Sequence, residues 1–175
     1  MNVLLGLTGS ISVYKSVEIL RKFQKNNDSV SVIMTDSACK LISPVIFETF
    51  TPGNVHIALF RQNSDPIIHI NIVKNNDLLL VAPATANIIG KFANGIADDL
   101  LSTTFIAWDK EVVIAPAMNT KMLENPAVVN NLNVLKKRGA YIIEPEKGEL
   151  ACSDDGAGRL PSADDIFKYC KELKK

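Results

Sequence analysis

The sequence predicts an α/β protein in which one open parallel sheet is covered by helices on both faces. Short apolar runs alternate along the whole chain with segments whose apolar residues recur at helical spacing. The runs are continuous, without a polar residue at every second position, which is typical of parallel strands that are buried on both faces. Five strands separated by helices are therefore expected, in a Rossmann-like or flavodoxin-like sheet.

The amino-terminal half begins with a strand, a turn and a helix. Apolar residues 3–7 form the strand, and the turn Thr8-Gly9-Ser10 ends it. The helix is predicted by four apolar residues on one face: Val13, Val17, Leu20 and Phe23. Residues 29–35 are rich in β-branched side chains and predict a second strand. A short helix should begin at Ser43-Pro44, because proline is favoured at the first helical position.

The carboxyl-terminal half continues the alternation. Strands are expected at residues 78–81, 111–114 and 141–143, and helices at about residues 85–93, 99–108 and 125–138. Gly139 should close the third of these helices as a C-cap glycine. Residues 144–160 form a polar stretch with no predicted element. Ser162, with Asp165 three residues later, is typical of the start of a last helix.

The composition fits a single domain spanning residues 1–175, long enough to bury roughly 70% of its unfolded surface. Nineteen basic and nineteen acidic residues cancel, and the longest basic run is residues 136–138. The chain therefore lacks the electrostatic pattern of a nucleic-acid-binding protein. No apolar segment approaches the ~20 residues that span a bilayer, so no membrane partner is expected.

The cysteines and histidines predict a cytoplasmic protein without a metal site. The amino terminus lacks the cationic leader of a secretory signal. Cys39, Cys152 and Cys170 form no C-x-x-C pair, and an odd number of cysteines fits a reducing compartment. His56 and His69 lie far from any cysteine in the sequence, so metal-ligand spacing is absent.

Polar residues follow four of the predicted strands. After the first strand, Gly9, Ser10 and Ser12 open a helix whose backbone N–H groups favour a phosphate. The turn does not match G-x-G-x-x-G, so a mononucleotide is preferred to a dinucleotide. Similar residues follow the next strands: Thr35, Ser37, Thr85, Asn87 and Asn119. Each alone is an ordinary cap or turn residue, but together they predict a flavin site at the carboxyl edge of the sheet.

Four residues have both an ordinary and a functional interpretation. Asn119 and Met122 lie on the loop after a buried strand. They are either ordinary residues of a capped turn or ligand contacts, in which Asn119 donates from its amide and Met122 gives apolar surface. His69, in an apolar stretch, is either a core histidine bound to a backbone carbonyl or a general base. Cys152, followed by two aspartates and two glycines, is either a chance loop cysteine or a proton donor on a closing flap.

Three separated motifs resemble those of the flavin-containing cysteine decarboxylases. They are P-A-T-A-N-I-I-G-K-F-A-N-G-I-A-D-D-L-L-S-T from Pro83, P-A-M-N-T-K-M from Pro116 and A-C-S-D-D-G-A-G-R-L from Ala151. The resemblance extends from Val3 to about Leu160, with the motifs in the family's order. Bifunctional bacterial members carry a synthetase domain after this one, and the chain resembles the stand-alone form.

The resemblance implies a set of site residues. The expected FMN contacts are Gly9, Ser10, Ile11, Ser37, Thr85, Ala86, Asn87, Ile88 and Ala117. His69 matches the active-site histidine, Asn119 the amide that holds the substrate carboxylate, and Cys152 the proton donor. Met122 and Ala151 are the other expected substrate contacts. Family members form trimers or assemblies of trimers with flavin at a subunit interface, so His69 and the flavin are expected to come from different chains.

The segment 151–159 resembles the branch of the family that acts on 4'-phosphopantothenoylcysteine in coenzyme A biosynthesis. The implied reaction is oxidation of the cysteinyl side chain to a thioaldehyde by FMN, loss of CO2, and reduction of the resulting enethiol to give 4'-phosphopantetheine. His69 is the candidate for proton removal, and Cys152 is the candidate for proton donation in the last step.

Three alternatives remain open at this point. A peptidyl-cysteine decarboxylase of peptide-antibiotic maturation would share the flavin site and Asn119. A flavin prenyltransferase would need a different phosphate site and no cysteine flap. A non-catalytic regulatory subunit with a flavin fold would not need His69, Asn119 and Cys152 together. The colour of the purified protein and its substrate distinguish these alternatives.

Overall fold

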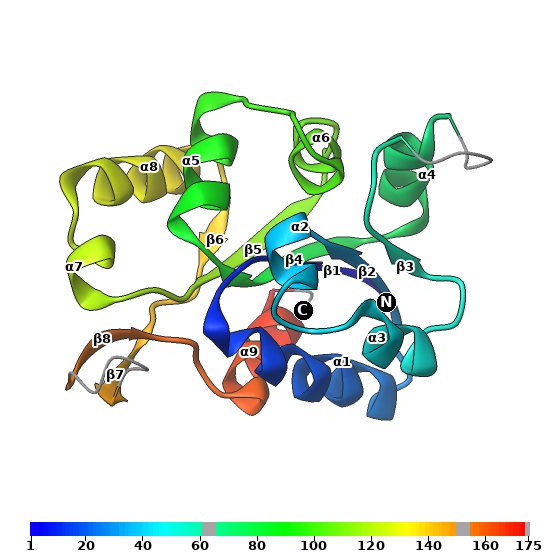
Figure 1. The fold of residues 1–175 in the computed structure, drawn as a ribbon, viewed down its shortest axis with the longest axis horizontal. Helices are drawn as coiled ribbons and strands as arrows, with labels where there is room; N and C mark the ends of the chain where they lie inside the picture. Colours follow the sequence, from blue (N-terminus) through cyan, green and yellow to red (C-terminus); the bar gives the residue numbers. More distant parts are fainter. Residues whose placement is uncertain (61–65, 150–154, 174–175) are drawn as a thin grey trace.

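Within residues 1–60, 66–149 and 155–173, which the computed structural model describes, six parallel strands form a central sheet (Figure 1). The strands are β1 (Asn2–Leu7), β2 (Ser29–Met34), β3 (Val55–His56), β4 (Leu78–Ala84), β5 (Glu111–Pro116) and β6 (Tyr141–Ile142). Their order is β3-β2-β1-β4-β5-β6, and each neighbouring pair is parallel. The order reverses between β1 and β4, where open α/β sheets bind ligands beyond the carboxyl ends of the strands.

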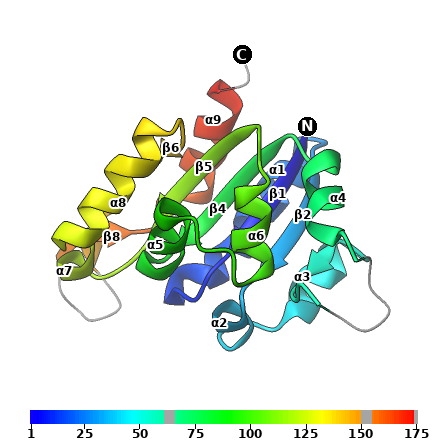
Figure 2. The ribbon, with the colours of Figure 1, turned by 90° about the horizontal axis from the view of Figure 1, so that it is seen from above.

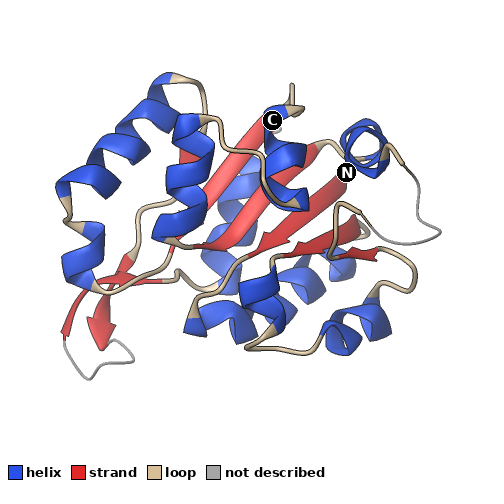
Figure 3. Ribbon diagram, turned by 45° about the horizontal axis from the view of Figure 1, so that its top comes forward, coloured by secondary structure: helices blue, strands red, loops and turns tan. Residues whose placement is uncertain are grey.

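Helices cover both faces of this sheet (Figures 2 and 3), which confirms the predicted fold class. One face is covered by η1 (Ile11–Lys15), α1 (Ser16–Lys25), α3 (Pro44–Phe50) and α9 (Ala163–Glu172). The other is covered by α4 (Ile68–Asn75), α5 (Ala86–Asn94), α6 (Leu100–Ile106) and α8 (Pro126–Lys137). The short helices α2 (Asp36–Cys39) and α7 (Thr120–Leu123) follow β2 and β5.

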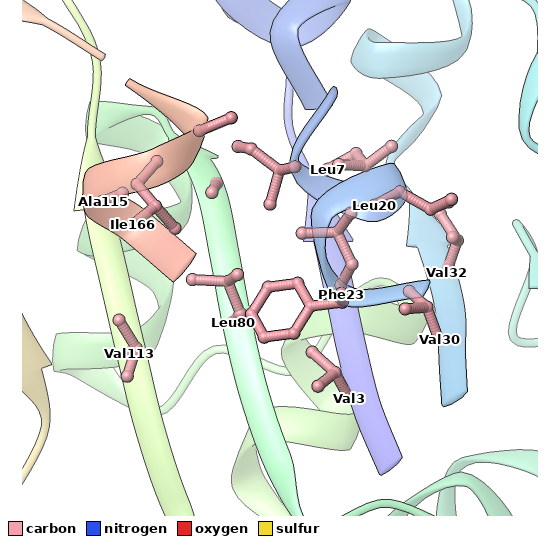
Figure 4. Packing of buried hydrophobic residues seen from close by; sticks show 14 of the residues in the cluster. Val3, Leu7, Leu20, Phe23, Val30, Val32, Leu80, Val113, Ala115 and Ile166 are labelled. Atoms are coloured by element: carbon pink, nitrogen blue, oxygen red, sulfur yellow. The ribbon is translucent and has the colours of Figure 1, made fainter. Parts of the chain in front are cut away.

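The strands are apolar throughout because successive side chains enter two different cores. In β4, Leu78 and Leu80 belong to the core under α1 and α9, whereas Leu79 and Val81 belong to the core under α5 and α6. In Figure 4, Phe23 of α1 lies among side chains of neighbouring strands in the first of these cores. Each fully buried side chain of this size contributes about 1.5–3 kcal/mol of hydrophobic stabilisation.

Besides the short helices α2 and α7, which the sequence did not predict, the structure differs from the predicted elements in three places. The sheet has one more strand than expected, because the two residues of β3, Val55 and His56, form no apolar run, whereas the equally short β6 belongs to the run Tyr141 to Ile143. The stretch 144–160 was expected without an element, but it contains the antiparallel hairpin of β7 (Glu146–Glu149) and β8 (Asp155–Arg159). The segment that carries His69 was assigned no element, and it forms α4. The hairpin is rich in glycine and charge, so tertiary contacts override its low strand propensity.

A buried carboxylate joins the last helix to the amino-terminal edge of the sheet. Asp28 accepts hydrogen bonds from Lys171 Nζ at 2.8 Å and from the Met1 ammonium group at 2.9 Å. Asn26 Nδ2 donates a third at 3.3 Å. Burial alone would raise the pKa of Asp28, but these hydrogen bonds outweigh it, so the pKa lies below its ordinary value.

We expect Asp28→Asn to lower the free energy of unfolding by about 2 kcal/mol at pH 7, because Lys171 loses its buried anionic partner. A carboxylate with a depressed folded pKa stabilises the fold fully above its unfolded pKa of about 3.9. That stabilisation is lost as the pH falls through the folded pKa. Urea denaturation of both proteins between pH 7 and pH 2 should therefore show a difference that shrinks in acid.

The matched control is Asp164→Asn, because Asp164 forms an exposed ion pair with Lys22 and its side chain is 71% accessible. An exposed pair of this kind contributes little, so this variant should stay close to the wild type. If the effect of Asp28→Asn were the same at pH 7 and pH 2, the carboxylate charge would not be the cause.

Candidate functional site

Buried hydroxyl groups fix the loop after β1 to the end of β4. Thr8 Oγ1 donates a hydrogen bond to the Pro83 carbonyl at 2.7 Å and accepts one from the Thr85 amide at 3.1 Å. Ser16 Oγ donates to the Ala82 carbonyl at 2.8 Å. Thr8 and Ser16 are both buried, where a polar group without a partner would be costly. The switch point of the sheet is therefore held together by side chains as well as by strand pairing.

The loop after β1 also lies directly against the loop after β2. A Cβ atom on Gly9 would lie 2.5 Å from Ser37 Cβ, which is closer than two carbon atoms can approach. The Thr35 amide donates to the Leu7 carbonyl at 3.0 Å, and Thr35 Oγ1 accepts from the Ala38 amide at 3.3 Å to cap α2. Only glycine fits at position 9, and Ser37 is held beside the first turn.

The amino terminus of α5 opens at the same place. Thr85 is its N-cap, and its Oγ1 accepts a hydrogen bond from the Ile88 amide at 3.5 Å. Ala86 and Asn87 form the first turn, and Asn87 is exposed. The first N–H groups of a helix have no acceptor within the helix, so this end attracts anions. The expected flavin-contact residues 85–88 thus lie beside the loop that Thr8 anchors.

The loop after β5 runs along this edge and carries Asn119. The buried residue Ala117 donates its amide hydrogen to the Ala84 carbonyl at 3.0 Å, which joins the loop to the end of β4. Asn119 is the N-cap of α7, and its Oδ1 accepts a hydrogen bond from the Lys121 amide at 2.9 Å. This bond orients the amide group. Met122, one turn later, has an exposed side chain.

His69 lies at the other end of the molecule. It belongs to α4, which packs against α6, whereas α7 lies beyond β5 and β6 (Figures 1 and 2). Its Nδ1 atom is buried, and no described residue is a hydrogen-bond partner for it. Nδ1 of His69 therefore does not make, with any described residue, the carbonyl hydrogen bond that a core histidine would use. The structure does not bring His69 to Asn119 within one chain.

Ala151 and Cys152, the remaining expected site residues, lie outside the described residues. Among the residues that are described, no group of three or more His, Cys, Asp or Glu side chains could hold a metal ion. In the same part of the chain, no helix is long and apolar enough to cross a membrane.

Reasoning from the sequence missed Thr8, which makes the central contact of the site. The sequence feature that could have identified it is a threonine between an apolar strand and a glycine. A polar side chain at the end of a buried strand is itself buried and needs a hydrogen-bond partner. Its partners lie 75 and 77 positions away, so the sequence alone does not identify them.

The sheet order and the joined loops define an open-sheet α/β protein with a candidate ligand site at its switch point. A family described as Flavoprotein matches residues 1–174, and the chain belongs to this family.

Two curated relatives are especially informative. The coenzyme A biosynthesis bifunctional protein CoaBC of Bacillus subtilis is 46% identical over 172 residues, which cover 98% of this chain and 42% of that protein. The chain thus spans about two fifths of the length of the bifunctional relatives. The probable phosphopantothenoylcysteine decarboxylase of Streptococcus mutans is 36% identical over 173 residues, which cover 97% of each chain.

Solved structures are similar over nearly the whole fold. A mutant of PPC decarboxylase complexed with pantothenoylaminoethenethiol matches with a TM-score of 0.87 and 30% identity, covering 99% of this chain and 97% of that one. The FMN-dependent cysteine decarboxylase SpaF matches with a TM-score of 0.86 and 28% identity, covering 100% of this chain and 98% of that one.

We expect Gly9→Ala to weaken FMN binding by about tenfold or more, or about 1.4 kcal/mol, because the added carbon separates the loops after β1 and β2. Titration of the apoprotein with FMN, followed by quenching of flavin fluorescence, measures this change. The control is Gly90→Ala in α5, where the added Cβ would only contact Asn131 Nδ2 at 3.7 Å. Wild-type FMN affinity in the Gly9→Ala protein would rule out this role of the close approach.

Proposed function

We propose that this chain is an FMN-dependent decarboxylase that converts 4'-phosphopantothenoylcysteine to 4'-phosphopantetheine in coenzyme A biosynthesis. The observation that carries the proposal is the junction of the loops after β1, β2, β4 and β5 at the switch point. It places neutral donors and the amide of Asn119 at one edge of the sheet. The full-length similarity to a probable phosphopantothenoylcysteine decarboxylase supports the choice of substrate.

The residues at the switch point fit FMN. Ser10 Oγ and Ser12 Oγ lie 3.1 Å apart and, with Ser37 and the first N–H groups of α5, offer neutral donors to a phosphate. Ile11 is 62% exposed and offers apolar surface to a ring system. When bound, FMN supplies reversible two-electron oxidation of the cysteinyl side chain, which places a C=S group β to the carboxylate.

Asn119 is proposed to hold the substrate carboxylate. The hydrogen bond from the Lys121 amide to Oδ1 fixes the orientation of the side chain. The carboxylate loses its charge when CO2 leaves, so a cationic partner would stabilise the ground state more than the transition state. A neutral amide positions the group with less of this penalty. Met122 and Ala151 are proposed as further contacts with the substrate.

Cys152 is proposed as the proton donor to the enethiol as it is reduced to the product. Two aspartates follow it closely in the sequence, and nearby negative charge disfavours a thiolate. A thiol is the form that can donate a proton.

His69 is proposed as the base, acting in a site shared between subunits of a homotrimer or an assembly of trimers. Within one chain α4 and α7 lie at opposite ends of the sheet, so a shared site is the arrangement that brings His69 and Asn119 together (Figure 2). The buried Nδ1 of His69 has no partner among the described residues, and a neighbouring subunit could provide one. Phe60, 87% exposed, and the exposed Ile67 precede α4 and offer apolar surface for such contact.

We place the protein in the cytoplasm, where a thiol substrate stays reduced. Cys39 and Cys170 are free thiols in the structure, and burial raises the pKa of Cys170 to about 12, which keeps it protonated. Recovery of the protein from a secreted or membrane fraction of its source cells would contradict this location.

The direct test of the function is to purify the protein, record its visible spectrum, and supply 4'-phosphopantothenoylcysteine. We expect a yellow protein that releases CO2 and forms 4'-phosphopantetheine in equal amounts. The Cys152→Ser variant should release CO2 but accumulate the enethiol, because protonation in the last step is impaired. A solved structural relative is a peptidyl-cysteine decarboxylase, EpiD, so a cysteine-terminated peptide is the comparison substrate.

Each outcome of this test decides between the alternatives. A yellow protein that acts only on the peptide would replace the proposal by peptidyl-cysteine decarboxylation. Transfer of a prenyl group to flavin would indicate a prenyltransferase. A colourless protein that does not take up FMN would indicate a regulatory subunit.

The shared site is tested by mixing two inactive variants, His69→Ala and Asn119→Asp. We expect each variant alone to have less than about 1% of wild-type activity, since a lost catalytic group typically costs 10²-fold or more. Co-expression of the two with different tags yields mixed trimers. In random trimers, about one quarter of sites formed between neighbouring chains combine an intact His69 with an intact Asn119.

The hybrid preparation should therefore regain about one quarter of wild-type activity. If His69 and Asn119 of the same chain formed the site, no mixed trimer would contain an intact one. Absence of recovered activity in a preparation that contains both tags would overturn the shared site, as would a monomer in sedimentation analysis.

A further inference from the structure

The loop that carries Asn119 is attached to strand β8 on both sides of that residue. The Met118 amide donates a hydrogen bond to the Gly158 carbonyl at 3.0 Å. On the other side, Thr120 Oγ1 donates to the Ala157 carbonyl at 2.7 Å. Asn119 lies between these two attachments, so its backbone cannot shift without lengthening one of them.

Two glycines of β8 make this contact possible. A Cβ on Gly156 would lie 2.1 Å from Thr120 Oγ1, and a Cβ on Gly158 would lie 2.0 Å from the Met118 carbonyl oxygen. Gly158 also has a φ of +136°, a conformation that favours glycine. The backbone of β8 therefore approaches the Asn119 loop more closely than any strand with side chains at these positions could.

We propose that Thr120 is a positioning residue for Asn119, and that its hydroxyl holds the Asn119 loop and β8 together as one unit. The inference rests on the proposed function, because Asn119 holds the substrate carboxylate there. A displaced amide would meet the carboxylate in a poor geometry, and small errors in the position of a reacting group reduce turnover strongly. Thr120 itself needs no contact with the substrate.

The structure supports a specific role for the hydroxyl of Thr120. The bond to Ala157 joins residues 37 positions apart and ties Thr120, the first residue of α7, to β8. Valine has nearly the shape of threonine but cannot donate, so Thr120→Val removes the bond with little change in packing. Serine keeps the hydroxyl donor, so Thr120→Ser should keep the hydrogen bond to the Ala157 carbonyl.

The first measurement is steady-state kinetics with 4'-phosphopantothenoylcysteine. We expect Thr120→Val to lower kcat/KM by about tenfold, the size expected for a lost hydrogen bond of this kind, and Thr120→Ser to stay within about twofold of the wild type. The changes in FMN affinity and melting temperature should be no larger than those caused by the control Thr49→Val. That control removes the hydrogen bond from the Thr49 hydroxyl to the Val45 carbonyl in α3. Wild-type kcat/KM in Thr120→Val would overturn the proposal. So would equal losses in Thr120→Val and Thr120→Ser.

The second measurement does not depend on activity. Hydrogen exchange of the peptide that contains the Met118 amide should be about tenfold faster in Thr120→Val than in the wild type or in Thr120→Ser, because the attachment to β8 opens more often. Unchanged exchange would overturn the coupling of the loop to β8. If the wild type failed to turn over its substrate, the proposed function would fall, and exchange would still decide whether Thr120 holds the two segments together.

Discussion

The hydroxyl of Thr8 joins the two halves of the sheet at the point where the strand order reverses. In one direction it donates to the Pro83 carbonyl, and in the other it accepts from the Thr85 amide that precedes α5. Because the hydroxyl is buried, losing either partner would leave a polar group unpaired in an apolar region. The hydrogen bonds of Thr8 thus hold the first turn of α5 in position, and with it the proposed phosphate site.

The other parts of the site depend on that junction in turn. Gly9 lies against Ser37 because the loop after β1 is held in place, and Ala117 reaches the Ala84 carbonyl at the end of the same strand, β4. The loop with Asn119 then extends from Ala117 to its attachment on β8. Rigid loops on a parallel sheet suit a site that must hold a large cofactor and orient a small carboxylate beside it.

Reasoning from the sequence predicted the long elements well and the contacts between them poorly. β1, β2, β4 and β5 were found because both of their faces are buried, which gives continuous apolar runs. Strand β3 was missed because Val55 and His56 form no apolar run, and the hairpin β7–β8 was missed because glycine and charged residues give it no strand pattern. Caps such as Thr85 and Ser162 could be inferred from residue type, because their partners are three residues away. The roles of Thr8, Gly158 and Thr120 could not, because their partners lie far along the chain.

Because α4 and α7 lie at opposite ends of one chain, the proposed active site requires an assembly of chains. A structure of the oligomer with FMN bound is the most direct measurement of it. We expect flavin against Gly9, Ser37 and Thr85 of one chain, with His69 of a neighbouring chain directed at the same flavin. A flavin bound elsewhere, or a His69 that lies far from every flavin in the assembly, would contradict it.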